Sequence, residues 1–463
     1  MEIRKLYMEN FFGKEALKQF FFNGIAQKTG KGIDKISPNK FSKDLDKNLL
    51  EICKKIESDS YKFSPYLEYL RLKGRDRKPR TISIPTTRDK IVLTALKEYL
   101  HDIFNDCVNR KLPNQYIKLL KETISNENYS NYAKLDIKNF YESIDHKILL
   151  EQIAIRVKDP IIMNLIRRSI MTPTMARIVS REERKKRINR KGVPQGLPVS
   201  NIMANIYLAS FDSLKLPNNT KILRYVDDIF IQSDQNNLKT IIENSISHSL
   251  TELGLKLNCE KTKYGDINID GVEYLGYYLK GKLITVKNSN IDNFIQSLAS
   301  KFTWFKNGSQ NSALIPDWLS NDINLFKKRF IEELNEKITG AKSEKKRYGW
   351  LFYFLEIEDL ELLFKLDRIV SKFFQQLEHF EHQKPKAVKS FVRAFYEIRH
   401  NGGGNYILDY DKYSSIESMK SYLFEYGQIN NNKDYTDKEI KQLFYKLRSR
   451  RLFNLKEDAK RES

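Results

Sequence analysis

One stretch constrains this chain more than any other: residues 222–231, which read Ile-Leu-Arg-Tyr-Val-Asp-Asp-Ile-Phe-Ile. Isoleucine, valine, tyrosine and phenylalanine favour strands, whereas aspartate favours turns because its side chain bonds to nearby backbone. The pattern therefore predicts a β-hairpin that carries Asp227 and Asp228 at its tip. Adjacent carboxylates repel each other and are costly to bury unless a cation lies between them. Mg²⁺ or Mn²⁺ would suit these oxygen ligands, although an Asp-Asp pair taken alone is usually a solvated turn.

Another carboxylate stands at the end of a second predicted strand. Residues 132–146 read Tyr-Ala-Lys-Leu-Asp-Ile-Lys-Asn-Phe-Tyr-Glu-Ser-Ile-Asp-His, and the alternating apolar residues fit one face of a strand that ends at Asp136. Phe140 and Tyr141 then begin a turn into a helix. An aspartate that leaves a buried strand is a common metal ligand, but it can equally cap a helix.

Two segments are dense in basic residues. Residues 71–90 carry eight basic and two acidic side chains, and they lead into a predicted strand at 81–84 and an apolar helix from Ile91. This segment is either a solvated loop or a set of cations that hold a triphosphate or a template backbone. Residues 180–191 carry seven basic and two acidic side chains and lead into Gly-Val-Pro-Gln-Gly-Leu-Pro-Val-Ser at 192–200. Glycine and proline define a loop there that lets the backbone approach a ligand closely.

The charge balance extends this pattern to the whole chain. Lysine and arginine number 81 against 59 aspartates and glutamates, which gives a formal charge of +22. Such an excess often serves solubility alone, but here it is interleaved with tyrosine and phenylalanine that could stack on bases. Nucleic acid is therefore the predicted partner class.

Length and cysteine content set further bounds. The 463 residues suffice for two or three domains, and Cys53, Cys107 and Cys259 are too scattered for a zinc site or a disulfide framework. We find no secretory signal and no apolar run of about 18 residues. These features predict a cytoplasmic protein that does not interact with a membrane.

Six elements of this chain occur in the order of the successive motifs of reverse transcriptases, and together they resemble that family over about residues 70–285. They are Arg80 to Pro85 with Arg88 to Lys90; Lys134 to Tyr141; Pro194 to Gly196 with Ser200; Tyr225 to Asp228; Gly254 and Leu255 with Glu260 to Thr262; and Tyr274 to Gly276. The resemblance implies an α+β right-hand polymerase, with fingers, a palm built on a small antiparallel sheet, and an α-helical thumb-like C-terminal region. The implied domains are a helical extension at 1–60, fingers and palm at 61–285, and a basic helical region at 286–463.

The resemblance also assigns roles, and the chemistry agrees with it. Nucleotidyl transfer uses two divalent ions, Mg²⁺ or Mn²⁺, held by carboxylates from separate segments. The predicted catalytic residues and metal ligands are Asp136, Asp227 and Asp228. The predicted nucleotide-binding residues are Arg80, with Arg75, Arg77 and Lys78 as competitors; Tyr141, a bulky gate that excludes a 2′-hydroxyl; Gln195; Gly196; and Lys261, with Lys256 and Lys263 as competitors. Tyr274, Leu275 and Gly276 are the predicted primer grip.

The resemblance to the individual subclasses of reverse transcriptases is unequal. Group II intron enzymes share the Asn-Ile-Tyr-Leu of residues 205–208, but they normally have proline where this chain has Asn201, and three scattered cysteines cannot build their zinc-binding tail. The elements that flank the hairpin in retron enzymes are absent from this sequence, and no RNase H or integrase domain is evident. The combination of Gly-Leu-Pro-Val-Ser at 196–200 with an aromatic helical region near 348–359, interpreted as core, is similar to the abortive-infection and defence-associated (unknown-group) reverse transcriptases of bacteria.

That subclass implies anti-phage defence with a noncoding RNA as template, dNTPs as substrates, a DNA product, the bacterial cytoplasm and a homo-oligomer. The alternatives are a retron-type enzyme, a maturase derived from group II introns, and an RNA-binding splicing cofactor without catalysis. Arg393 and His400 resemble the nuclease signature of HEPN domains, although such spacing is frequent by chance. A protein-primed start on one of the 25 tyrosines is also open.

Overall fold

The chain divides into two compact units that are interleaved in sequence. The first comprises Met1–Lys111 and Ile124–Asp266, and the second comprises Leu112–Thr123 and Ile267–Ser463. The computed structural model describes residues 2–26, 30–72, 79–108, 111–127, 129–180, 182–183, 187–217, 219–234, 238–315, 319, 321–429 and 434–459. The domain boundaries predicted at residues 60 and 285 remain a prediction.

A four-stranded antiparallel sheet forms the centre of the first unit, in the order β5-β6-β3-β7. Its strands are β3 (Asn131–Asp136), β5 (Thr220–Tyr225), β6 (Asp228–Ser233) and β7 (Lys263–Asp266). Along β3 and β6 one set of alternating residues is buried in the main core, and Asp136 and Asp228 belong to the other set. A second sheet, in the order β2-β1-β4, consists of β1 (Tyr66–Arg71), β2 (Arg80–Ile84) and β4 (Thr174–Met175).

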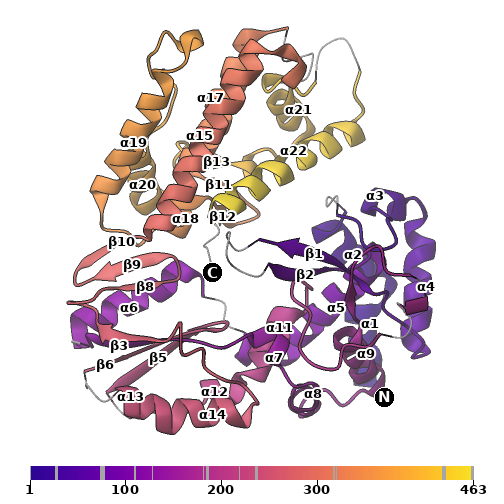
Figure 1. The fold of residues 1–463 in the computed structure, drawn as a ribbon. Coiled ribbons are helices and arrows are strands. Elements are labelled where there is room, and N and C mark those ends of the chain that lie inside the picture. Colours follow the sequence, from indigo (N-terminus) through magenta and orange to yellow (C-terminus); the bar gives the residue numbers. More distant parts are fainter. Residues whose placement is uncertain are drawn as a thin grey trace. The chain divides into compact units, whose positions relative to one another are not determined.

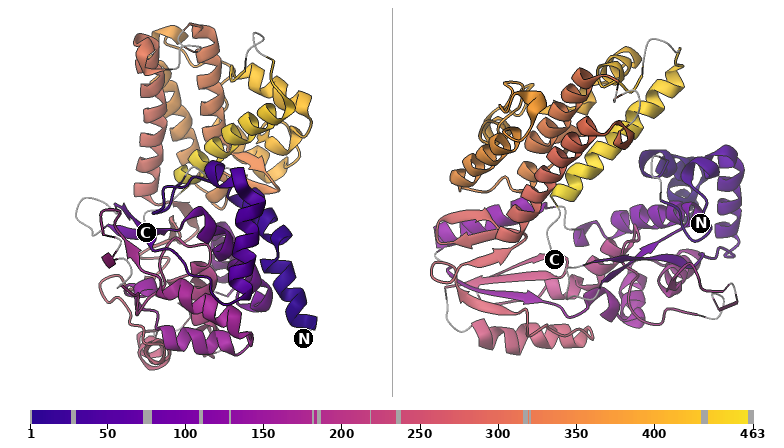
Figure 2. Two further views of the ribbon diagram at one scale, coloured as in Figure 1. Left: turned by 90° about the vertical axis from the view of Figure 1, so that its right-hand side faces the viewer. Right: turned by 45° about the horizontal axis from the view of Figure 1, so that its top comes forward.

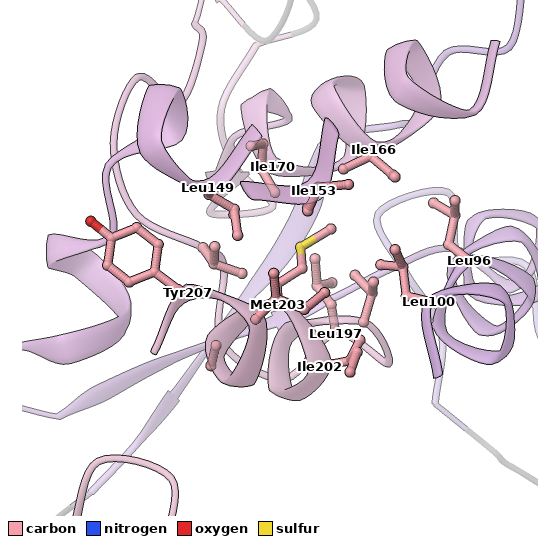
Figure 3. Close-up of a cluster of buried hydrophobic side chains, with 14 of the residues drawn as sticks. Leu96, Leu100, Leu149, Ile153, Ile166, Ile170, Leu197, Ile202, Met203 and Tyr207 are labelled. Carbon is pink, nitrogen blue, oxygen red and sulfur yellow. The ribbon is translucent and has the colours of Figure 1, made fainter. Parts of the chain in front are cut away.

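Helices supply most of the core of the first unit (Figure 1). They are α1 (Glu2–Phe12), α2 (Lys14–Gly24), α3 (Pro38–Phe41), α4 (Leu45–Glu57), α5 (Thr87–Ile103), α7 (Phe140–Ser143), α8 (His146–Ala154), α9 (Pro160–Met171), α11 (Ser200–Tyr207), α12 (Ala209–Asp212), α13 (Leu238–Ile241) and α14 (Ser247–Glu252). Figure 3 shows α11 at the middle of this core, where Met203 faces apolar side chains of α8, α9 and α5. The N-terminal helices pack into the same core.

One predicted helix begins earlier than expected. The helix expected from Ile91 begins at Thr87, because the Thr86 hydroxyl accepts a hydrogen bond from the backbone N–H of Asp89 and caps the helix. Residues 255–264 form a bridge between Ile137 and Leu257 and then enter β7. Between them the chain turns, because the Asn258 carbonyl accepts hydrogen bonds from the backbone N–H groups of Lys261 and Thr262.

The second unit is mainly helical, with two small sheets. Its strands are β8 (Val272–Tyr274), β9 (Tyr277–Lys280), β10 (Leu283–Val286), β11 (Ala341–Ser343), β12 (Lys346–Tyr348) and β13 (Leu408–Asp409). Its helices are α6 (Pro113–Glu127), whose last residues count to the first unit, α15 (Asn288–Gln310), α17 (Ile323–Thr339), α18 (Trp350–Tyr353), α19 (Leu360–Phe374), α20 (Phe391–His400), α21 (Ile416–Glu425) and α22 (Asp437–Asp458). Figure 2 shows α15, α17 and α22 side by side.

The aromatic stretch 348–359 of this unit is core, as predicted, since Trp350 and Phe354 are both buried. It is less helical than expected: residues 341–348 form the hairpin β11–β12, and α18 has only four residues. Among the described residues, no helix combines the length and the apolar composition needed to cross a bilayer.

Buried charge makes the second unit sensitive to pH. Burial, and then the nearby Glu425, raise the pKa of Glu332 to about 7. The folded state therefore holds a proton that the unfolded chain releases above the ordinary pKa of 4.5, so stability falls as pH rises from about 4.5 to about 7. Glu332→Gln should raise the melting temperature at pH 8 by about 2–4 °C. The difference should vanish near pH 4.5, and Glu417→Gln, an exposed control on α21, should show none at either pH.

Candidate active site

The predicted hairpin is present, but its tip is shifted by one residue. Tyr225 pairs with Asp228, so the turn consists of Val226 and Asp227, and Asp228 is already the first residue of β6. Val226 has φ +60°. Two-residue hairpin turns need such an angle and normally place glycine or asparagine there. A β-branched residue in this conformation costs on the order of 1–3 kcal/mol, and strain of this kind concentrates at functional sites.

The sheet register brings the predicted carboxylates to one end of the central sheet. Asp136, the last residue of β3, pairs directly with Asp228 on β6. Side chains at such opposed positions have Cβ atoms about 4.5–5.5 Å apart. Asp227 is the neighbouring turn residue, so the three aspartates come from two segments that are distant in sequence and end at the same edge of the sheet.

These carboxylates fit a metal that keeps other ligands. In the part of the chain that the structure describes, no three histidine, cysteine or acidic side chains form a metal cluster by themselves. Mg²⁺ and Mn²⁺ need fewer protein ligands when water and phosphate oxygens complete the shell. The site also attracts cations, since the Lys261 ammonium lies 3.2 Å from an Asp136 carboxylate oxygen. Of the lysines named from the sequence, Lys261 is therefore the one that contacts the carboxylate of Asp136.

Asp136 is further held by Asn258, which the sequence analysis missed. The Asn258 backbone N–H donates to the Asp136 carbonyl at 2.8 Å, and its side-chain amide donates to the Asp136 carboxylate at 3.2 Å. Asn258 lies 122 residues from Asp136 along the chain. The only sequence signal is a polar residue between Leu257 and Lys261, which by itself indicates a turn.

Tyr141 is partly buried, and it lies within electrostatic range of the hairpin tip. Burial, and then the charge of Asp227, raise the pKa of its phenol well above the ordinary value, while Arg80 acts in the opposite direction. The three predicted residues therefore lie near one another although they come from α7, the β5–β6 turn and β2. Val193 donates its backbone N–H to the Tyr141 carbonyl at 2.8 Å, which fixes α7 against the following loop. The competing residues Arg75, Arg77 and Lys78 lie outside the described residues.

Gln195 and Gly196 join that loop to β2. Ser83 donates its backbone N–H to the Gln195 carbonyl at 2.7 Å, and the Gln195 amide donates to Glu142 at 3.0 Å. Gly196 has φ +95°, and a Cβ there would lie 2.7 Å from a methyl group of Ile82. The loop therefore passes directly over β2, beside the Tyr141 helix.

The same loop requires a second glycine, and this yields a prediction. Gly192 has φ +81°, and a Cβ there would lie 2.8–2.9 Å from backbone atoms of Tyr141 and Glu142, which cannot move aside easily. Gly192→Ala should destabilise the first unit by more than about 1 kcal/mol and should lower any activity that depends on Tyr141. Gly402→Ala is the matched control, because no atom lies within 4 Å of its Cβ position. Equal melting temperatures for the two variants would contradict this account.

The predicted primer-grip residues form a tight turn in the second unit. Tyr274 pairs with Tyr277, and Leu275 and Gly276 between them have φ +48° and +83°. The Gly276 carbonyl accepts hydrogen bonds from Lys287 at 3.0 Å and Asn290 at 3.2 Å. Their role as a primer grip remains a prediction.

Arg393 and His400 both lie on α20 but have different neighbours. The Arg393 guanidinium lies 4.5 Å from the Tyr406 ring centre and 3.6 Å from Glu397. The His400 ring lies 5.9 Å from the ring of Tyr396. No contact between Arg393 and His400 is found among the described residues.

The region that contains this site is similar to known proteins. Residues 72–279 match the family described as reverse transcriptase (RNA-dependent DNA polymerase). The group II intron-encoded protein LtrA of Lactococcus lactis subsp. cremoris is 26% identical over 192 residues, which are 40% of this chain and 31% of that protein. A COX1/OXI3 intron 2 protein of Saccharomyces cerevisiae is 25% identical over 299 residues, which are 50% of this chain and 34% of that protein. This chain thus spans about a third of the length of these relatives.

Among solved structures, apo telomerase from Candida tropicalis is 13% identical, covers 97% of this chain and 84% of its own, and has a TM-score of 0.39. The family match, together with the small antiparallel sheet that carries the carboxylates, confirms the predicted fold class. It is the α+β fold of a right-hand polymerase with fingers and palm, followed by a helical C-terminal region.

Proposed function

We propose that the reverse transcriptase domain at residues 72–279 makes this protein an RNA-directed DNA polymerase. One observation carries the proposal: the β3–β6 register sets Asp136 opposite Asp228, directly beside the strained turn that holds Asp227. Carboxylates that repel one another are costly to keep together unless they bind cations. A protein that served only as an RNA-binding scaffold would gain nothing from retaining them.

The chain's own residues divide the work of nucleotidyl transfer. Asp136, Asp227 and Asp228 would hold Mg²⁺ or Mn²⁺, which when bound supplies positive charge to the attacking hydroxyl and to the phosphate. Lys261, beside Asp136, would donate a proton to the departing pyrophosphate. Arg80 would hold the triphosphate.

The substrate pocket would be shaped by groups that meet around α7. The partly buried ring of Tyr141 would lie beneath the sugar and exclude ribonucleotides. Gln195 and Gly196, whose loop passes over β2, would line the pocket for the nucleotide and the template base. The turn formed by Tyr274, Leu275 and Gly276 would hold the primer strand.

Primer extension tests the activity directly. Purified protein is incubated with oligo(dT) on poly(rA), labelled dTTP and either Mg²⁺ or Mn²⁺. We expect labelled DNA to accumulate with the metal present and not with a chelator. Failure on RNA and DNA templates, with both metals and with self-primed RNA extracted from the purified protein, would overturn the proposal.

For the biological role, we propose cDNA synthesis in bacterial anti-phage defence on an associated noncoding RNA, by a homo-oligomer. Support comes from the Gly-Leu-Pro-Val-Ser motif at 196–200 joined to a helical second unit. The test is to sequence the RNA and DNA that co-purify with the protein expressed from its native locus. A discrete noncoding RNA with complementary DNA supports this role, and the molecular mass in solution tests the oligomer.

A second role is favoured by one finding: the relatives are a group II intron-encoded protein and an intron 2 protein. A maturase related to them, or a retron-type enzyme, is therefore the alternative. Spliced intron RNA without DNA in the same purification would support a maturase or splicing cofactor and exclude the defence role.

A further inference from the structure

Arg224 is a buried cation on β5, three residues before Asp227, and it contacts both the hairpin turn and the helices beside it. Its side chain is only 6% exposed. One guanidinium nitrogen, Nη1, donates to the Val226 carbonyl at 2.8 Å. Nε donates to Asp212 at 2.6 Å, and Nη2 donates to the second oxygen of the same carboxylate. The guanidinium therefore bridges the turn and the end of α12.

This bridge acts on the strained part of the site. Val226 adopts a left-handed conformation that its branched side chain disfavours, so the turn needs a contact that opposes relaxation. A bidentate arginine–aspartate pair fixes the plane of the guanidinium, which fixes the direction of the remaining donor. That donor meets the carbonyl of Val226, the residue bonded to Asp227.

The helix side of the bridge is itself firmly placed. Asp212 ends α12, whose Phe211 is fully buried. The buried Asn205 on α11 lies 3.4 Å from Nη1 and accepts a weak hydrogen bond from it. Asn205 in turn donates to Asn201 at 2.9 Å. The hairpin tip is thus tied through Arg224 to helices that belong to the core.

We propose that Arg224 is a positioning residue for the polymerase reaction, and that Asp212 orients it. By holding the Val226 carbonyl, Arg224 sets the direction in which the Asp227 carboxylate points toward the metal. This inference rests on the proposed function, because it assigns the turn a role in metal binding. Arg224 acts on the turn through its hydrogen bond to the Val226 carbonyl, while Asp212 fixes the guanidinium.

The experiment compares Arg224→Lys and Asp212→Asn with a matched control, Arg168→Lys. Arg168 also pairs with an aspartate, Asp59, at 2.7 Å and donates to a backbone carbonyl, that of Tyr61, at 3.2 Å, but it lies on α9. Lysine keeps the positive charge but cannot form the two parallel hydrogen bonds that a guanidinium donates to one carboxylate. For each protein we would measure kcat and KM for dTTP, the Mg²⁺ concentration at half-maximal rate, the melting temperature, and Mn²⁺ binding by electron paramagnetic resonance without nucleotide.

We expect Arg224→Lys to lower kcat by about 10²-fold, the effect of a displacement of about 1 Å at a reacting group, with KM for dTTP changed less than about threefold. Mn²⁺ binding should weaken severalfold, and Asp212→Asn should show the same pattern more weakly. Arg168→Lys should change only the melting temperature. Unchanged Mn²⁺ binding in both Arg224→Lys and Asp212→Asn would overturn the positioning role. The same conclusion would follow if the loss of kcat in all three variants, including Arg168→Lys, were proportional to the loss of melting temperature. An inactive wild-type protein would refute the proposed polymerase, whereas the Mn²⁺ comparison would still test Arg224.

Discussion

Replacing Asp227 by asparagine should abolish dNTP incorporation, with a loss of at least ~10³-fold in kcat. The substitution keeps the volume of the side chain and removes one negative charge from the hairpin turn. A metal ion contributes several kcal/mol to charge stabilisation, and each 1.4 kcal/mol corresponds to about tenfold in rate. Asp136→Asn should have an effect of the same size, because Asp136 faces the hairpin directly through the β3–β6 register. Primer extension under single-turnover conditions measures both variants.

The matched control for these variants lies on the neighbouring strand, at the opposite end of the sheet. Asp266 on β7 pairs with Asn131, the first residue of β3, and accepts a hydrogen bond from Ser130 at 2.7 Å. Asp266→Asn should retain its activity, since asparagine still offers an oxygen acceptor there. RNA binding should persist in all three variants. Activity of the Asp227 and Asp136 variants near that of the wild-type protein would exclude catalysis by these carboxylates.

Replacing Tyr141 by alanine should produce the second large effect, a loss of discrimination between dNTPs and rNTPs. The ring is partly buried and lies within electrostatic range of Asp227 and Arg80, so its removal would leave space where a 2′-hydroxyl could fit. Shape-based pockets discriminate by roughly 10–200-fold, and we expect the ratio of kcat/KM for dTTP and UTP to fall by about that factor. Most of the change should appear as a lower KM for UTP.

The control for the gate is Tyr141→Phe, which keeps the ring and removes the hydroxyl. It should preserve the preference for dTTP, because exclusion depends on the volume of the ring. Truncation of a buried aromatic residue costs about 3–5 kcal/mol of stability, and Tyr141 is partly buried. The melting temperatures of both variants must therefore be measured and must lie above the assay temperature. An unchanged preference in a folded Tyr141→Ala protein would show that another group excludes ribonucleotides.

Local patterns in the sequence predicted the parts of the site that local physics controls. Alternating apolar residues indicated β3 and the β5–β6 hairpin, since burial of one sheet face imposes a period of two. The predicted position of the hairpin tip differs from the observed position by one residue, because Asp228 is already the first residue of β6. Short strands such as β11 and β12 escaped prediction, because three-residue strands are too short for a period to be recognised.

The residues that hold the carboxylates could not be predicted in this way. Asn258 reaches Asp136 across 122 residues of sequence, and Arg224 reaches Asp212 across 12. No propensity or periodicity specifies such pairs, because they depend on the register of the sheet and on where helices pack against it. The sequence by itself thus determined which side chains are the candidates for the chemistry, through residue type and order along the chain. Only the tertiary structure decided how those side chains are held, since hydrogen bonds between distant segments form only when the core brings them together.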